Sequence, residues 1–336
     1  MLSVVEGLPA GFLEAKASGL NGLLGGPTLI HLHGRRAEPL FVSILLHGNE
    51  VTGLSAIQQV LARYQTKPLP RSLSLFVGNL LAAREGMRRL DSQPDYNRVW
   101  PGCKPQGLPE ESMMAQVVDA MRLRQVFASI DIHNNTGSNP HYACVNRLDQ
   151  RCFHLATLFS RIVLYFVRPT GVQAMAFGEL CPAVTVECGK AGSGASDDHA
   201  AAFVEAALHL DHFPHHPVAR RDLDLYHTVA LVKVPESIRF TFGQAGADLV
   251  FEPDIDRLNF TDLGEGTCFG RVASGCALPL QAVADDGRDV AAQFFEVREG
   301  ELVTRQAIMP AMLTCNEPAI RQDCLCYLME RMNYGG

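Results

Sequence analysis

The sequence has little excess positive charge, and its basic residues are not clustered. It contains 29 Lys and Arg against 36 Asp and Glu, which gives a net charge of −7 at pH 7. No run of basic residues occurs along the chain. Such a chain lacks the electrostatic footprint of a protein that binds nucleic acid or an anionic membrane surface. Any positive groups that bind a ligand must therefore act locally, at a site.

Long apolar runs and a secretory leader are also missing. No window approaches the roughly 18 consecutive apolar residues that a membrane span requires. The first thirty residues contain Glu6 and Glu14 and end without a small-residue cleavage pattern, so they do not resemble a signal peptide. We therefore expect a cytoplasmic protein that does not associate with membranes.

The ten cysteines are scattered, and no two of them form a CxxC pair. In a chain of this length they are typical of small buried hydrophobic residues and not of a disulfide framework. Cys324 and Cys326 could bind a metal, but a lone CxC is weak support for that. The chain also lacks the GxxxxGK[ST] order of a phosphate-binding loop and the GxSxG setting of a serine hydrolase. These absences exclude several common enzyme classes.

Apolar material is plentiful: 47% of the 336 residues are hydrophobic. That fraction supports a sizeable core and excludes disorder, and the length suggests about two domains. Within residues 1–212, short apolar runs alternate with segments of helical spacing, which indicates an α/β sheet. The expected strands are 41–46, 73–78, 129–132, 163–167 and 183–187, and the expected helices are 52–64, 116–127 and 200–209.

The character of the sequence changes at residues 213–217, where proline and histidine cluster. Beyond this point short β-type runs are separated by turn pairs such as Asp286-Gly287 and Glu299-Gly300. We therefore predict a first domain over 1–215 and a second, mostly β domain over 222–336. No side chain in the second domain can be given a role from the sequence.

Polar clusters follow three of the predicted strands, at 47–50 (HGNE), 131–137 (DIHNNTG) and 186–192 (VECGKAG). Ligand sites of open α/β sheets gather at the carboxyl ends of strands. His47 and Glu50 can converge on a cation across a tight turn, and His133 can complete a set of two histidines and one carboxylate. This set with an open fourth position is typical of catalytic zinc, although it also suits Fe(II). An isolated HxxE is more often a surface contact, so the position of His133 at a strand end strengthens the interpretation.

These residues resemble the aspartoacylase and succinylglutamate desuccinylase family of zinc-dependent amidohydrolases, relatives of the zinc carboxypeptidases. The resemblance covers roughly residues 45–192 through four ordered motifs: HGNE, Asp95-Tyr96-Asn97-Arg98 with Pro101-Gly102, DIHN, and Val186-Glu187. It implies a mixed-sheet α/β/α domain like that of zinc carboxypeptidases, followed by a smaller, mostly β C-terminal domain.

The resemblance also implies roles for single residues. One zinc per chain would be held by His47, Glu50 and His133, and Glu187 would be the general base and then the proton donor. Asn97 and Arg98 would bind a substrate carboxylate. Asp131 follows the pattern of a carboxylate that orients a metal ligand, although capping of nearby backbone would explain it equally well.

An arginine that polarises the scissile carbonyl is expected about nine residues after an asparagine at a strand end. Counting from Asn79 gives Arg88, with Arg89 as the neighbouring alternative. Without the family pattern, both arginines could simply be solvated on a loop.

The combined prediction is a deacylase that cleaves the amide bond of a small N-acyl amino acid. The arginine that helps mammalian-type aspartoacylases hold a side-chain carboxylate is missing, because Phe177 stands about ten residues before Glu187. N-acetylaspartate is therefore a poor candidate. Two alternatives stay open: a metallocarboxypeptidase acting on peptides, and a non-catalytic metabolite-binding protein. The acyl group, the amine and the oligomeric state, including a homo-oligomer, are not determined by the sequence.

Overall fold

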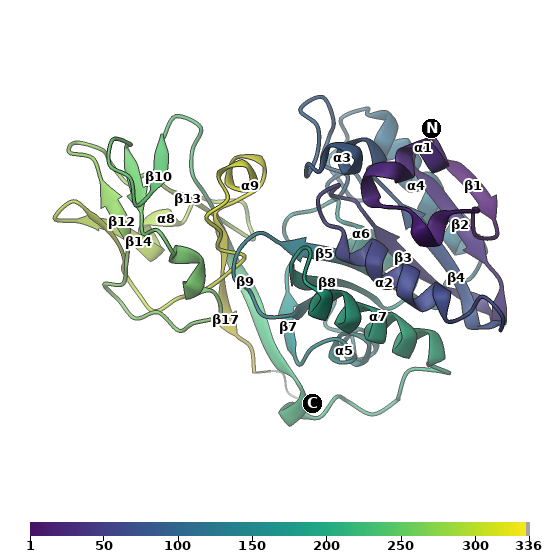
Figure 1. Cartoon of the computed structure of the whole chain (residues 1–336). Coiled ribbons are helices and arrows are strands. Elements are labelled where there is room, and N and C mark those ends of the chain that lie inside the picture. The colour runs from purple at the N-terminus through teal and green to yellow at the C-terminus, as the bar shows by residue number, and fades with distance from the viewer. Residues whose placement is uncertain (334–336) are drawn as a thin grey trace.

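The computed structural model describes residues 1–333, which fold into a large mixed sheet flanked by helices and a second, smaller sheet (Figure 1). The large sheet has 12 strands, in the order β1-β2-β4-β3-β5-β8-β6-β7-β9-β17-β16, with β13 paired to β9. The fold prediction of an α/β protein with a smaller β-rich unit near the C-terminus is thus confirmed.

The strands of the large sheet come from both ends of the described chain. They are β1 (Ser3–Glu6), β2 (Thr28–Leu32), β3 (Gly34–Ile44), β4 (Leu69–Val77), β5 (Ala128–Asn135), β6 (Tyr142–Val145), β7 (Ile162–Tyr165), β8 (Ala183–Lys190), β9 (Asp224–Lys233), β13 (Gln281–Ala284), β16 (Met309–Ala311) and β17 (Cys326–Arg331).

Helices cover both faces of the central strands, and two further short helices, the last two within residues 1–333, lie in the C-terminal part. They are α1 (Leu20–Leu24), α2 (Thr52–Ala62), α3 (Leu80–Glu85), α4 (Pro109–Leu123), α5 (Gln150–Thr157), α6 (Gln173–Phe177), α7 (Gly194–His209), α8 (Ala291–Phe294) and α9 (Glu317–Gln322), with short 3-10 turns η1 (Phe12–Glu14), η2 (Ala17–Gly19), η3 (Arg220–Asp222) and η4 (Ile255–Leu258).

The alternation of side chains along β3 explains the two helical layers. Leu40, Val42 and Ile44 point to the face covered by α2 and α7, while Phe41 points to the opposite face, covered by α4 and α6. There Phe41 stacks on Phe177, with ring centroids 4.2 Å apart. Because successive residues of a strand face opposite sides, a strand buried on both faces is apolar at nearly every position, as 40–46 is with the one exception of the hydrogen-bonded Ser43.

The smaller sheet forms the end of the molecule farthest from the N-terminus (Figure 1, left). Its order is β10-β11-β12-β15-β14, formed by β10 (Phe240–Phe242), β11 (Leu249–Phe251), β12 (Cys268–Val272), β14 (Phe295–Arg298) and β15 (Glu301–Thr304). The predicted Glu299-Gly300 turn joins β14 to β15, and both of its residues have positive φ, 53° and 83°. That is the geometry of a two-residue hairpin turn, whose twist matches that of the strands it joins.

Every strand and helix expected from the sequence overlaps an element of the structure, with shifted ends. Helix α4 begins at Pro109, before the expected start at 116. Pro109, Glu110 and Glu111 form its first turn, where a proline and acidic side chains favour a helix start. The helix therefore begins earlier than expected because the spacing of apolar residues does not take account of these N-terminal residues.

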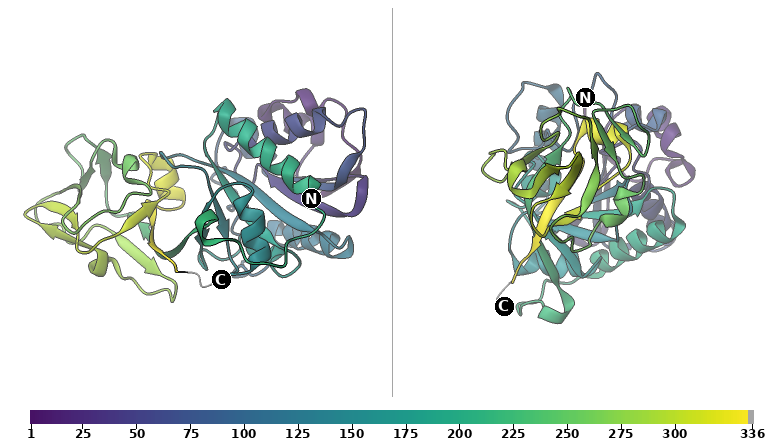
Figure 2. Two further views of the ribbon diagram at one scale, coloured as in Figure 1. Left: turned by 90° about the horizontal axis from the view of Figure 1, so that it is seen from below. Right: turned by 90° about the vertical axis from the view of Figure 1, so that its left-hand side faces the viewer.

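The large sheet continues across the segment where the sequence suggests a domain boundary. Strand β7 pairs in parallel with β9, and β9 pairs in turn with β17 and β13 (Figure 2). The division at 215–222 stays a prediction, and the structure adds that backbone hydrogen bonds link the two parts. All ten cysteines are free. Over residues 1–333, the helices are all too short or too polar to cross a membrane.

Candidate functional site

The ends of three neighbouring strands bring the predicted site residues together. Strand β3 pairs in parallel with β5, and β5 pairs in parallel with β8. The turn after β3 carries His47 and Glu50, while His133 on β5 lies directly opposite Glu187 on β8 in the register. Parallel pairing therefore places the polar ends of these strands at one edge of the sheet, as expected for open α/β sheets.

The HGNE turn is held by a close approach between its glycine and α3. A Cβ atom at Gly48 would lie 2.1 Å from the backbone nitrogen of Ala83, so another residue could not fit without moving the helix. The Gly48 N–H also donates to the carbonyl of Arg88 at 3.0 Å. This packing fixes the turn that carries His47 and Glu50 and ties it to the segment of Arg88.

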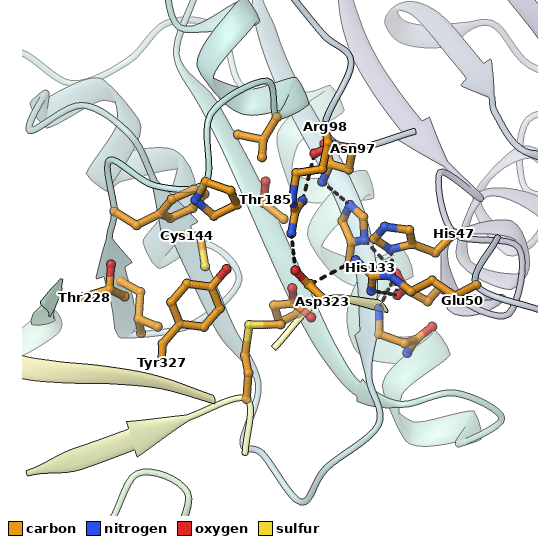
Figure 3. A pocket seen from close by; sticks show the side chains of 18 residues that line it. His47, Glu50, Asn97, Arg98, His133, Cys144, Thr185, Thr228, Asp323 and Tyr327 are labelled. Atoms are coloured by element: carbon orange, nitrogen blue, oxygen red, sulfur yellow. Dashed lines mark hydrogen bonds and ion pairs between the residues drawn. The ribbon is translucent and has the colours of Figure 1, made fainter. Parts of the chain in front are cut away.

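His47, Glu50 and His133 form a compact and buried cluster (Figure 3). Nδ1 of His47 lies 2.8 Å from Oε1 of Glu50, and Nδ1 of His133 lies 2.6 Å from Oε2 of the same carboxylate. One ligand atom from each residue can be chosen so that all three lie within 4.8 Å of one another. The cluster is therefore a candidate metal site with two nitrogen ligands and one oxygen ligand.

The far side of each imidazole faces a carboxylate. Nε2 of His47 lies 3.0 Å from Oδ1 of Asp95, and Nε2 of His133 lies 2.7 Å from Oδ2 of Asp131. Asp131 in turn accepts a hydrogen bond from the hydroxyl of Ser43 at 2.6 Å. Carboxylates in this position fix the tautomer and the orientation of metal-binding histidines. They leave both Nδ1 atoms pointing at the centre of the cluster.

Charged groups in and around the cluster shift the pKa values of its three residues. Burial alone would lower the pKa of His133, but Asp131 and Glu50 outweigh this effect and raise it well above the usual value. The pKa of His47 is raised as well, since the pull of Glu50 and Asp95 exceeds burial and the repulsion from Arg88. The pKa of Glu50 is lowered, because both imidazoles overcome the cost of burying its charge. The cluster is thus a negatively charged oxygen between two nitrogen bases, which suits a cation.

Glu187 lies in the same pocket but has a different environment. Burial raises its pKa from 4.5 to about 7, and the nearby positive groups, His133 first, only partly oppose that shift. Its Oε2 accepts a hydrogen bond of 2.6 Å from the side-chain amide of Asn135, whose Nδ2 also lies 3.3 Å from the hydroxyl of Tyr142. A carboxyl group with a pKa near neutrality can both accept and return a proton under physiological conditions.

Of the two neighbouring arginines, Arg88 lines the pocket. Its Nη1 lies 3.7 Å from Oε1 of Glu50, and its Nη2 donates to Asp95 at 2.9 Å. Arg89 instead donates to the backbone carbonyl of Gln93 at 3.2 Å. The nine-residue count from Asn79 therefore leads to the arginine beside the metal-ligand cluster.

Asn97 and Arg98 also line the pocket. The side-chain nitrogen of Asn97 lies 3.2 Å from Oδ2 of Asp131 and 3.1 Å from Nε2 of His133, and its oxygen accepts from the backbone N–H of Gln173. Both ends of this amide thus contact protein groups, and its expected contact with a substrate carboxylate stays a prediction. Arg98 reaches across the pocket to Asp323 (Figure 3).

Several residues around the pocket could not be found from the sequence. The C-terminal part contributes Asp323, Tyr327, Met312 and Thr228 to the wall opposite the strand ends. They belong to no motif, and the pairing of β9 with β7 and of β17 with β9 and β16 carries them to the site. Asp95 had a usable signal, since it opens the motif that contains Asn97 and Arg98, but its contact with His47 depends on the fold.

The space between these elements amounts to about 630 Å³, part of which is open to solvent. Charged groups occupy the end beside the metal-ligand cluster, and the remaining wall is largely apolar. Its apolar and aromatic lining consists of Leu164, Phe166, Pro169, Val172, Met312 and Tyr327. A small molecule with a polar end and an apolar end would match this division.

Comparisons with known proteins agree on the fold. Succinylglutamate desuccinylase from Vibrio parahaemolyticus superposes with a TM-score of 0.61 at 10% sequence identity, covering 96% of this chain and 95% of that one. Murine aminoacylase 3 gives a TM-score of 0.59 at 14% identity over 89% and 96% of the two chains. Succinylglutamate desuccinylase from Chromobacterium violaceum gives 0.57 at 17% identity over 90% and 87%. No curated protein sequence matches significantly.

A family model for the succinylglutamate desuccinylase/aspartoacylase catalytic domain matches residues 39–212, which is more than half of the chain. The match includes the three residues of the metal-ligand cluster, both arginines of the pocket and Glu187. The chain therefore belongs to the succinylglutamate desuccinylase/aspartoacylase family.

Proposed function

We propose that the protein is a zinc-dependent hydrolase that cleaves the amide bond of a small carboxylate-bearing substrate, an N-acyl amino acid or a close analogue. The observation that carries this proposal is the position of Glu187. A buried carboxyl group with a pKa of about 7 lines the same pocket as the His47, Glu50 and His133 cluster and as Arg88 and Arg98. Amide hydrolysis needs a proton-transfer group, an electrophile and an anchor for the substrate, and this pocket contains candidates for all three.

The residues present fit a zinc ion. His47, Glu50 and His133 offer two nitrogen atoms and one oxygen atom within 4.8 Å of one another, and the carboxylates of Asp95 and Asp131 orient the two imidazoles. Three ligands of this kind leave a fourth position open, as in catalytic zinc sites. When bound there, zinc would supply Lewis acidity toward a carbonyl and would make a water molecule more acidic.

Glu187 would accept the proton of the attacking water and later return it to the leaving amine. Its pKa of about 7 is suited to both steps, because a proton then moves in either direction at little cost. The hydrogen bond from Asn135 fixes one carboxylate oxygen. The other oxygen is left for the reacting molecules.

The two arginines would take different parts of the substrate. Arg88 lies beside Glu50 and would stabilise the negative charge that develops on the scissile carbonyl oxygen. Arg98 lines the same pocket and would bind the substrate carboxylate, with Asn97 next to it in the chain. A planar guanidinium group is well suited to a carboxylate because it can donate two parallel hydrogen bonds.

The walls of the pocket favour a small substrate over a peptide. Met312, Tyr327 and Thr228 from the C-terminal part close the side opposite the strand ends. The names of the similar structures, succinylglutamate desuccinylase and aminoacylase 3, also point to removal of an acyl group. Phe177 is buried at the position where a second arginine would be expected, so the proposal does not extend to N-acetylaspartate.

The proposal can be tested with Glu187→Gln and a panel of N-acyl amino acids. We expect the parent protein to contain about one zinc per chain and to hydrolyse part of the panel. Glu187→Gln should keep the zinc and lose activity by a factor of about 10² to 10⁴, the usual contribution of a general acid–base group. His133→Ala should lose the metal itself. Elemental analysis and amine release measure these two properties separately.

Glu330→Gln is the matched control, because that carboxylate is 67% exposed on β17 and away from the pocket. It should keep both zinc and activity. Full activity in Glu187→Gln would contradict the assigned role. Zinc with no hydrolysis of any substrate, but with saturable binding of N-acyl amino acids, would favour a metabolite-binding protein. Efficient cleavage of long peptides would favour a carboxypeptidase.

A further inference from the structure

Arg88 and Arg98 share one internal carboxylate, that of Asp323. Oδ1 of Asp323 accepts a hydrogen bond of 2.8 Å from Nη2 of Arg98, and Oδ2 accepts one of 3.0 Å from Nη2 of Arg88. The three side chains are 15–25% exposed, so these ion pairs are largely removed from water. Asp323 therefore lies in a fork formed by the guanidinium groups of Arg88 and Arg98, and Figure 3 shows its contact with Arg98.

Some of the remaining donor positions of the fork are engaged by other groups, while Nη1 of Arg88 lies 3.7 Å from Glu50, beyond hydrogen-bond distance. The second hydrogen bond of Arg88 Nη2 goes to Asp95 at 2.9 Å, and Nη1 of Arg98 donates to the carbonyl of Asn97. Within residues 1–333, the buried Nε of Arg88 has no hydrogen-bond partner. As long as Asp323 stays in place, a substrate carboxylate would have to compete with it for the donors that face the pocket.

Space for a displaced Asp323 side chain exists next to the fork. Asp323 lines the pocket described above and also a second, neighbouring hollow, which is partly open to solvent and is bordered by polar side chains such as Asn316 and Gln322. Rotation of the Asp323 side chain toward this hollow would keep its charge among polar groups.

The backbone around Asp323 is fixed, so only its side chain needs to move. The Asp323 N–H donates to the carbonyl of Ala319 at the end of α9, and the Leu325 N–H donates to the carbonyl of Val232 on β9. Exchange of one carboxylate for another also leaves the net charge at the fork unchanged. A neutral or cationic ligand would not replace Asp323 in this way, because Arg98 would lose its ion pair with Asp323 and Arg88 would keep only Asp95 and Glu50 as nearby carboxylates.

We propose that Asp323 is an internal stand-in for the substrate: a carboxylate-bearing substrate displaces it, placing its carboxylate at Arg98 in place of Oδ1 and its scissile carbonyl at Arg88 in place of Oδ2. Asp323 then determines specificity: it selects ligands whose negative charge can replace its own and sets how tightly they bind. This inference rests on the proposed function for the chemistry of the substrate, but it can be tested by ligand binding without turnover.

The direct test is calorimetric titration of the purified, metal-loaded protein with acetate, and separately with methylammonium as a cationic probe. Asp323→Asn and Asp323→Ala remove the internal competitor, so both should bind acetate about tenfold or more tightly than the parent, since a charge-assisted hydrogen bond is worth at least that factor. Methylammonium binding should be unaffected. The double variant Asp323→Asn/Arg98→Ala should lose the gain.

Asp254→Asn is the matched control, because Asp254 is an exposed aspartate of the same C-terminal part, paired with Arg257. It should bind acetate as the parent does. Asp323→Asn guards against a folding defect of the alanine variant, since it keeps the size of the side chain. Unchanged or weaker acetate binding in a folded Asp323→Asn protein would overturn the proposal, as would a loss of methylammonium binding, which would mark Asp323 as a receptor for a cation.

Kinetics provide a second readout. With a substrate from the N-acyl amino acid panel, Asp323→Asn should lower KM by a similar factor and change kcat far less. If the protein hydrolyses nothing but Asp323→Asn still gains acetate affinity, the proposed function fails and the assignment of Asp323 holds. If the protein hydrolyses a substrate but Asp323→Asn gains neither acetate affinity nor a lower KM, the proposed function holds and the assignment of Asp323 fails.

Discussion

The two sheets of the molecule differ in whether their charged side chains are buried or exposed. At the edge of the large sheet, Glu50, Asp131 and Glu187 are buried together with two histidines, and every one of these groups contacts another polar group. The small sheet has a buried core rich in phenylalanine, and its ion pairs, such as Arg239–Asp248 and Arg298–Glu296, lie toward solvent. Charged groups are thus buried, at a cost in desolvation free energy, at the edge of the large sheet, whereas those of the small sheet remain hydrated.

This difference separates function from stability. Buried carboxylates cost free energy unless they are paired, so a cluster of them is retained where chemistry requires it. Exposed ion pairs contribute little to stability, and the small sheet depends on apolar packing and on its turns. We therefore expect metal affinity and pH dependence to be controlled by the large-sheet edge, and changes in the small sheet to affect stability alone.

The largest effect should come from Glu187→Gln in chelator-treated protein. Because the pKa of Glu187 in the folded protein, about 7, lies above its ordinary value of 4.5, the folded state keeps a proton that the unfolded chain releases between these values. Its contribution to stability is therefore lost as the pH rises through this window. Relative to the parent, Glu187→Gln should gain up to about 3 kcal/mol between pH 5 and pH 8.

Urea unfolding of both proteins at the two pH values measures this gain, and Glu330→Gln provides the control with an exposed carboxylate. If the free energy of unfolding changes with pH equally in the parent and in Glu187→Gln, burial does not raise the pKa of Glu187.

A smaller effect is expected for Asp131→Asn. Its carboxylate lies 2.7 Å from Nε2 of His133 and holds that ring with Nδ1 toward Glu50. Loss of such an orienting carboxylate usually lowers metal affinity by about 10- to 100-fold. Competition with a fluorescent zinc chelator measures the affinity, with Asp254→Asn as the surface control. An unchanged zinc affinity would mean that Asp131 does not orient His133 and only accepts hydrogen bonds from Ser43 and Asn97.

The smallest effect should come from Gly300→Ala in the small sheet. Gly300 has φ of 83°, and a Cβ atom there would meet nothing within 4 Å, so the cost is conformational and not steric. We expect a loss of about 1 kcal/mol in the free energy of unfolding, the same at pH 5 and pH 8, with zinc affinity and KM unchanged. A change in either of the last two would show that the small sheet influences the site.

The sequence predicts the large-sheet side of the pocket well because its signals are local. His47, Glu50, His133 and Glu187 each lie at or just beyond an apolar strand, and parallel strands bring such ends together without further information. The element boundaries were less predictable. Strand β3 extends back to Gly34 through polar residues because its first half is only partly covered, so apolar spacing marks only its buried end.

The opposite wall could not be predicted, since it depends on contacts between residues far apart in the chain. Asp323 lies 225 positions from its partner Arg98. Nothing in the neighbouring sequence distinguishes it from the other aspartates, and its role appears only when β17 pairs with β9. Likewise, the side-chain amide of Asn97 contacts His133 and Asp131, and the motif alone does not predict these contacts.

The continuous sheet also bears on how fast a ligand can enter. Since β7, β9 and β17 form one hydrogen-bonded ladder, the two parts of the chain cannot swing apart about a hinge without breaking backbone pairs. We therefore expect ligands to enter through rotation of side chains such as Asp323 and not through domain closure, which takes microseconds to milliseconds. Ligand capture should accordingly show a single kinetic phase, whose observed rate constant rises linearly with ligand concentration.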